Sequence, residues 1–176
     1  ATVGITFSPT KAGSYAGTIT LKSAGAKTVT VILSGIATTA SAILYETIDF
    51  TAQGYENETT VESVDGTCCS VTFDKGSNKS NAPKYYTNGT AIRMYGGNTM
   101  TIASTTKTIA KIEITFGSSD GSNEITTDKV TYSNGTWTGS TSSVTFTTSG
   151  TSGNRRIRKV KVTYDGNDKY KASNAT

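Results

Sequence analysis

An all-β antiparallel sandwich is the fold class that this 176-residue sequence predicts, and three observations support it. Threonine occurs 35 times and leucine three times, and β-branched side chains suit a pleated sheet better than a helix. Apolar residues alternate with polar ones in many short runs, whereas no stretch repeats them at helical spacing. Turn signals separate these runs throughout the chain.

The first unit is expected over residues 1–36. Its three alternating runs centre on Val3 to Phe7, on Ile19 and Leu21, and on Val29 to Leu33. They predict three strands with an unpaired apolar face. A sheet of about 35 residues buries too little surface to be stable alone, so this unit is expected to need a partner. Residues 37–43 are expected to be a linker.

A larger sandwich is expected over residues 44–165, followed by a polar tail at 166–176. Its strands are predicted around Ile48 and Phe50 and over residues 69–73, 84–87, 90–95, 99–103, 112–116, 129–133, 136–138, 144–148 and 160–164. Ten short strands with frequent turns are typical of two packed sheets. The last strand changes phase between Ile157 and Val160, which predicts a β-bulge near Arg158.

Two Asn-Gly pairs set the register of two hairpins. Turning at Asn88-Gly89 places Lys84 opposite Arg93 and leaves Lys84, Tyr86, Arg93 and Tyr95 on the solvent side. A three-residue turn at Gly96-Gly97-Asn98 is expected to pair the next two strands, with Met94 opposite Met100.

The second Asn-Gly turn, Asn134-Gly135, places Tyr132 opposite Trp137. Val130 is in phase with Tyr132, so this aromatic pair is expected to face the core. Trp137 is interpreted either as a core residue or as an exposed platform for a ligand.

The adjacent cysteines leave three alternatives open. Cys69 shares an alternating face with Val71 and Phe73, so one buried and one exposed thiol is the simplest interpretation. A vicinal disulfide between Cys68 and Cys69 and a bridge from Cys68 to a second chain are the others.

Catalysis is not expected, and the chain is interpreted as a protein without catalytic residues. Histidine, the commonest general base, is absent. The carboxylates Glu46, Asp49, Glu56, Glu58, Glu62, Asp65 and Asp74 are interpreted as ordinary surface charges. No cofactor is expected; the alternative is a structural calcium ion at Asp165, Asn167 and Asp168.

Composition and charge limit the partners. Only 17% of residues are charged, and Ser, Thr, Gly and Asn are abundant, as in exported proteins, so a secreted or cell-surface location is expected. The net charge is +4, and the basic run Arg155, Arg156, Arg158, Lys159 and Lys161 is interpreted as a solvated face, without nucleic-acid binding. No apolar run approaches the ~20 residues of a membrane span, so no membrane insertion is expected.

Two segments resemble known families. The segment from Phe7 to Gly35, with Ser8-Pro9-Thr10 and Gly17-Thr18-Ile19-Thr20-Leu21, resembles the last strands of immunoglobulin-like repeats in bacterial surface proteins. The series Tyr45-Glu46-Thr47-Ile48-Asp49-Phe50, Lys84-Tyr85-Tyr86, Ala91-Ile92-Arg93-Met94-Tyr95-Gly96-Gly97-Asn98 and Lys111-Ile112-Glu113-Ile114-Thr115-Phe116 is similar to a jelly-roll, carbohydrate-binding-like module of large extracellular proteins of gut Bacteroidetes.

These resemblances imply a jelly-roll-like sandwich preceded by a partial immunoglobulin-like unit, in a surface adhesin or glycan-handling protein. The leading interpretation is a non-catalytic binding module whose ligand is a glycan or surface polysaccharide. Its expected ligand-binding residues are Tyr86, Arg93, Tyr95, Lys84 and Trp137. A structural spacer in an adhesin or fibre, packing on neighbouring β domains, is the alternative, and an accessory domain of a larger glycan-degrading enzyme is a third.

Overall fold

The computed structural model describes residues 13–37, 44–117 and 121–165, together with Thr6, Pro9 and Lys11. Contacts divide the chain into two compact units, Ala1–Ala42 with Asn167–Thr176, and Ile43–Gly166. The expected strand at residues 3–7 lies outside the described residues, apart from Thr6. So does the calcium site expected at Asp165, Asn167 and Asp168, apart from Asp165.

The first unit contains an antiparallel hairpin of β1 (Gly13–Leu21) and β2 (Val29–Ala37). Its register places Ile19 opposite Val31 and Leu21 opposite Val29, so large apolar side chains share one face. Leu21, Val29 and Val31 are exposed on this hairpin. The strands are longer than their apolar runs because backbone pairing continues through the small residues of β1 and β2. The immunoglobulin-like character of this unit stays a prediction.

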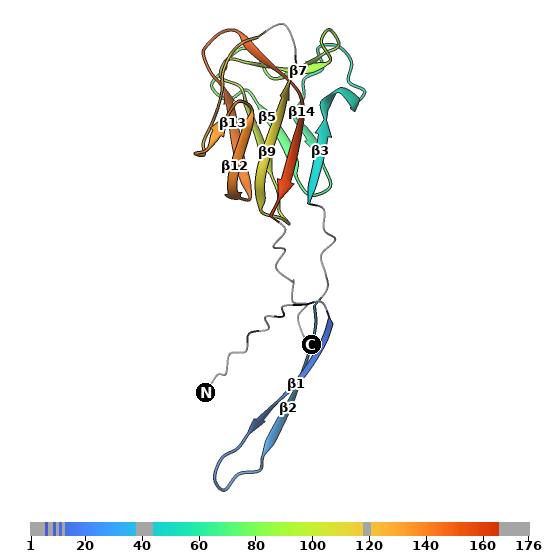
Figure 1. Ribbon diagram of the computed structural model, residues 1–176, viewed down its shortest axis with the longest axis vertical. Helices are drawn as coiled ribbons and strands as arrows, with labels where there is room; N and C mark the ends of the chain where they lie inside the picture. The colour runs from blue at the N-terminus through green and yellow to red at the C-terminus, as the bar shows by residue number, and fades with distance from the viewer. Residues whose placement is uncertain are drawn as a thin grey trace. The chain divides into compact units, whose positions relative to one another are not determined.

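The second unit is an antiparallel β-sandwich, which confirms the predicted fold class. One sheet has five strands, in the order β10 (Ile125–Thr127), β13 (Ser143–Thr148), β8 (Thr99–Ala103), β5 (Ser70–Asp74) and β4 (Ser63–Asp65). The other follows the path β11 (Tyr132–Ser133), β12 (Thr136–Thr141), β9 (Ile109–Phe116), β14 (Asn154–Tyr164), β7 (Ala91–Tyr95) and β6 (Lys84–Tyr86). The strand β3 (Tyr45–Asp49) also pairs with β14, and Figure 1 shows β12, β9, β14 and β3 side by side in this sheet.

The core lies between the two sheets. It is built from alternate residues of each strand, as the period of two predicts, and includes Val71, Phe73, Met100, Ile102, Val144 and Phe146 from one sheet and Tyr85, Ile92, Met94, Ile112, Val160 and Val162 from the other. A 3-10 turn, η1 (Phe50–Ala52), follows β3 and buries Phe50 edge-on against Phe73, with ring centroids 5.4 Å apart. The predicted strand therefore ends at Asp49, whose side chain caps the turn by accepting from the Thr51 amide.

The bulge near Arg158 is confirmed. Pairing of β14 with β9 shifts between Ile157 and Lys159, so Arg158 is an extra residue that returns Ile157 and Val160 to the same buried side. The strand begins at Asn154, however, and Arg156 is buried rather than solvated.

The hairpin predicted across Gly96-Gly97-Asn98 is wrong. The strands β7 and β8 are not paired, because the chain crosses from one sheet to the other at these three residues. Met94 and Met100 are both buried, as expected, since alternation is the same whether two strands share a sheet or face each other. Asn98 holds the crossing, because its buried amide donates to the carbonyls of Lys75 and Asn81 and its oxygen accepts from the Tyr95 amide.

The Asn134-Gly135 hairpin has the predicted register, with Tyr132 opposite Trp137. The pair faces the core as expected, since Trp137 is buried and Tyr132 packs against the core, but Val130 does not share this phase, because its side chain is 85% exposed. Thr131 has a φ of 69°, which breaks the alternation and shortens the predicted strand to Tyr132–Ser133.

Candidate functional site

The turn between β6 and β7 positions the predicted ligand-binding residues. Lys84 pairs with Arg93, Tyr85 with Ile92 and Tyr86 with Ala91, as the sequence predicts. The turn itself differs from the expected type, because positive φ angles occur at Gly89 and Thr90 rather than at Asn88 and Gly89. The Thr90 amide donates to the Thr87 carbonyl over 3.1 Å, so the strand register is kept.

Tyr86, Arg93 and Tyr95 form one cluster on the outer face of this sheet. The guanidinium carbon of Arg93 lies 4.3 Å from the centre of the Tyr86 ring and 6.0 Å from that of Tyr95. The two phenol oxygens are hydrogen-bonded to each other at 2.8 Å. This hydrogen bond to Tyr95, together with partial burial, raises the pKa of Tyr86. These contacts hold the three side chains half-buried on the face that the sequence predicted to be on the solvent side.

Arg156 joins this cluster from the adjacent strand β14. It pairs with Arg93, its guanidinium lies 5.7 Å from the centre of the Tyr86 ring, and it donates to the Asn88 carbonyl. Its exposed fraction is 4%. Gly89 allows this arrangement, because a Cβ there would lie 2.9 Å from Arg156 Nη1. We call Lys84, Tyr86, Arg93, Tyr95 and Arg156 the tyrosine–arginine face.

Trp137 does not belong to this face. Only 2% of its surface is exposed, and it packs in the core opposite Ile112. The interpretation of Trp137 as an exposed ligand platform is therefore wrong. Gly139 lies beside it for a steric reason, since a Cβ there would lie 2.5 Å from Cζ2 of the indole.

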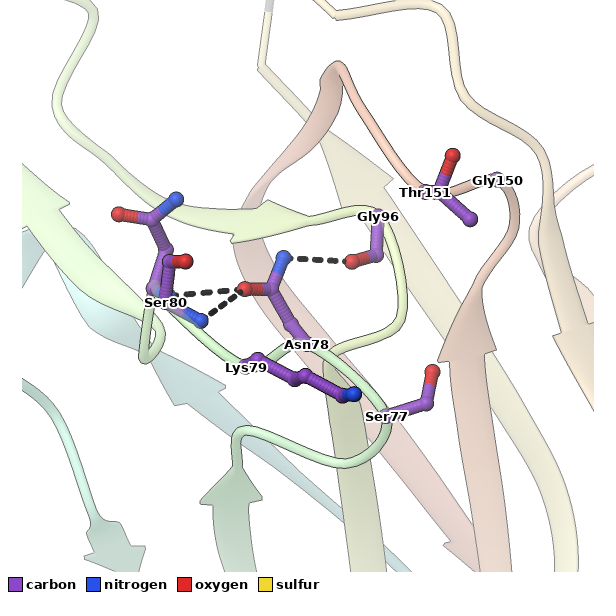
Figure 2. A pocket seen from close by; sticks show the side chains of 8 residues that line it. Ser77, Asn78, Lys79, Ser80, Gly96, Gly150 and Thr151 are labelled. Atoms are coloured by element: carbon purple, nitrogen blue, oxygen red, sulfur yellow. Dashed lines mark hydrogen bonds between the residues drawn. The ribbon is translucent and has the colours of Figure 1, made fainter.

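A polar pocket of about 360 Å³ lies at the loop end of β7 and was missed by the sequence analysis. Figure 2 shows Asn78 at its centre, donating to the Gly96 carbonyl at 2.7 Å and accepting from the Ser80 amide at 3.0 Å. Lys79 and Thr151 line it from separate loops. Only the Gly96-Gly97 turn signal pointed to this region.

Glu46 also differs from the sequence-based expectation. It was interpreted as a surface charge, yet its carboxylate accepts from the Thr67 amide at 2.6 Å, from the Cys68 amide at 3.1 Å and from the Tyr164 hydroxyl. These bonds outweigh partial desolvation and lower the pKa of Glu46. The carboxylate thus joins β3 and β14 of one sheet to the loop that precedes β5 of the other.

The two cysteines lie beside this carboxylate, and neither is in a disulfide. Cys69 is buried, as its alternating face predicts, and Cys68 is half-buried. Burial raises the pKa of Cys69 to about 12. The vicinal disulfide is absent from this structure, and the thiol of Cys69 is protonated at neutral pH.

Neither a metal-binding cluster nor a membrane-spanning helix occurs among the residues that the structure describes. No group of three or more Cys, Asp or Glu residues among them could hold a metal ion. None of the described helices is long and apolar enough to span a membrane.

Comparisons with known proteins identified no relative. No protein-family model matches the chain, and neither the curated proteins nor the solved structures yielded a match.

Proposed function

We propose that the sandwich is a non-catalytic carbohydrate-binding module of a secreted or cell-surface bacterial protein. The observation that carries the proposal is the linked pair Tyr86 and Tyr95, held around Arg93 on an outer sheet face. Tyrosine combines an apolar ring with a polar tip, which suits a sugar that has apolar C–H groups on one side and hydroxyls at its edge. Lys84 and Arg93 add hydrogen-bond donors beside the rings.

Preorganisation supports this assignment. The Tyr86–Tyr95 hydrogen bond and the stacked guanidinium fix three flexible side chains before any ligand arrives, which lowers the entropy lost on binding. The face also lies on regular strands, and sites on strands are held more rigidly than sites on loops.

Affinity electrophoresis in gels that contain one polysaccharide each tests the proposal. Tyr86→Ala is expected to weaken retention about three- to tenfold, the value of one aromatic contact. Tyr45→Ala is the matched control, because Tyr45 is a 60% exposed tyrosine on the same sheet with Lys161 Nζ 4.7 Å from its ring centre. Equal losses in both variants, or no retention by any polysaccharide, would contradict the proposal.

A structural spacer is the second candidate function, and the β1–β2 hairpin favours it. Ile19, Leu21, Val29 and Val31 form one apolar face on a sheet of two strands, which is marginal alone in water. Such a face suits packing against neighbouring β domains of the same parent protein. Absence of polysaccharide binding would favour this function over the first.

A further inference from the structure

Three cationic side chains form a row across the tyrosine–arginine face. Lys84 on β6 is directly opposite Arg93 on β7, and Arg93 is directly opposite Arg156 on β14. Their neighbours Tyr85, Ile92 and Ile157 are buried, so alternation places all three cations on the outer side of the sheet. The row spans two interstrand spacings, or roughly 10 Å.

Like charges directly opposite each other in a sheet repel. The positive charge continues along β14 through Arg158, Lys159 and Lys161, all exposed. Acidic groups also occur here. Asp49 interacts with Lys159 and Arg158, and Glu113 is 2.8 Å from Lys111.

Different contacts hold the three cationic side chains of the row. Arg156 is fixed beneath the turn by the Asn88 carbonyl, and Arg93 is stacked on Tyr86. Lys84 is half-buried at the outer end of the row. A guanidinium is planar, and two of its N–H groups on one edge bind a carboxylate or a sulfate through two hydrogen bonds.

We propose that the ligand of this face is an acidic polysaccharide, with carboxylate or sulfate groups bound by Lys84 and Arg93 and a sugar ring against Tyr86 and Tyr95. The buried Arg156 contributes positive charge from beneath the turn between β6 and β7. This inference rests on the proposed carbohydrate-binding function and narrows its ligand class. The tyrosine pair favours a sugar as the ligand. The net charge of the chain is only +4, which disfavours a nucleic acid or an anionic membrane.

Matched polymer pairs test the charge requirement with the full chain. Polygalacturonate, alginate and hyaluronan would each be compared with their carboxyl-reduced forms, and heparin and chondroitin sulfate with their desulfated forms, by affinity electrophoresis. The expected result is retention by at least one acidic polymer that falls about tenfold or more when its carboxylates are reduced or its sulfates are removed. Carboxyl reduction and desulfation distinguish the two kinds of anion.

Lys84→Gln and Arg93→Gln are expected to lose the same retention, whereas Lys129→Gln should keep it. Lys129 is the control because it undergoes the same loss of charge and lies 3.5 Å from Asp128, outside the row. Lys84→Gln should also keep or raise the thermal midpoint, since it relieves repulsion with Arg93. A purely structural role for Lys84 would lower it.

Each other outcome overturns the inference in a distinguishable way. Retention by a neutral polymer that Tyr86→Ala abolishes would leave the carbohydrate-binding function standing and refute the acidic ligand. Retention by no polymer would refute both. Binding to an oligonucleotide or to phosphatidylglycerol vesicles, with no binding to acidic polysaccharide, would assign the row to a different class of ligand.

Discussion

Removing the Glu46 carboxylate tests a half-buried polar link between the two sheets. In Glu46→Ala, the Cys68 amide and the buried Tyr164 hydroxyl both lose a charged acceptor, as does the more exposed Thr67 amide. A hydrogen bond to a charged group contributes about 1.5–3 kcal/mol. Water can replace part of this at Thr67, so we expect a loss of about 2–4 kcal/mol in the free energy of unfolding.

The effect should depend on pH in a defined direction. The pKa of Glu46 is lowered below its ordinary value of 4.5 in the folded state. Its ionised form therefore stabilises the fold above pH 4.5, and this contribution is lost as the pH falls through the folded-state pKa. The stability difference between the natural chain and Glu46→Gln should shrink over the same interval.

Urea unfolding, followed by circular dichroism at pH 7 and at several acidic values, measures both quantities. Glu62→Ala is the matched control, because Glu62 is exposed and only its backbone carbonyl is bonded, to the Phe73 amide. A loss below 0.5 kcal/mol in Glu46→Ala, roughly the range of an ordinary surface substitution, would refute the reasoning.

Three further predictions concern buried groups. Iodoacetamide at pH 8 should leave Cys69 unmodified in the folded protein, because the pKa of this thiol is about 12. Mass spectrometry measures the modification. An alkylated Cys69, or a mass two daltons lower from a vicinal disulfide, would contradict this prediction. Gly139→Ala should destabilise the sandwich by about 1–3 kcal/mol, because the new Cβ would clash with the Trp137 indole. An unchanged thermal midpoint with unshifted tryptophan fluorescence would count against this packing. Asn98→Ala leaves three backbone groups without their side-chain partner and should lower the urea midpoint, whereas a midpoint equal to that of the natural chain would show that Asn98 does not hold the crossing.

Local patterns predicted the strands and registers that depend on neighbours in sequence. The Asn-Gly turns gave the pairs Lys84 with Arg93 and Tyr132 with Trp137, because turn geometry fixes register within a hairpin. The change of phase after Ile157 located the bulge, because one extra residue in a strand shifts the alternation of its side chains. The clustering of Tyr86, Arg93 and Tyr95 follows from these registers.

Features that depend on distant segments could not be predicted from alternation. The sequence between Met94 and Met100 fits either a hairpin or a crossing between sheets, and only the packing of β14 beside β7 decides. Glu46 meets Tyr164 across 118 positions of sequence, and Arg156 meets Asn88 across 68. Their burial depends on which distant strands lie side by side. Composition and spacing do not reveal this, so the sequence predicted both residues to be surface charges.

The most direct test of the proposed function is an NMR titration of the ¹⁵N-labelled chain with short oligosaccharides cut from a polymer that retains it. We expect amide shifts to concentrate on β6 and β7, at Lys84–Tyr86 and Ala91–Tyr95, with smaller shifts at Arg156. Shifts centred on the Asn78 pocket instead, or no shifts at millimolar sugar, would contradict carbohydrate binding by the tyrosine–arginine face.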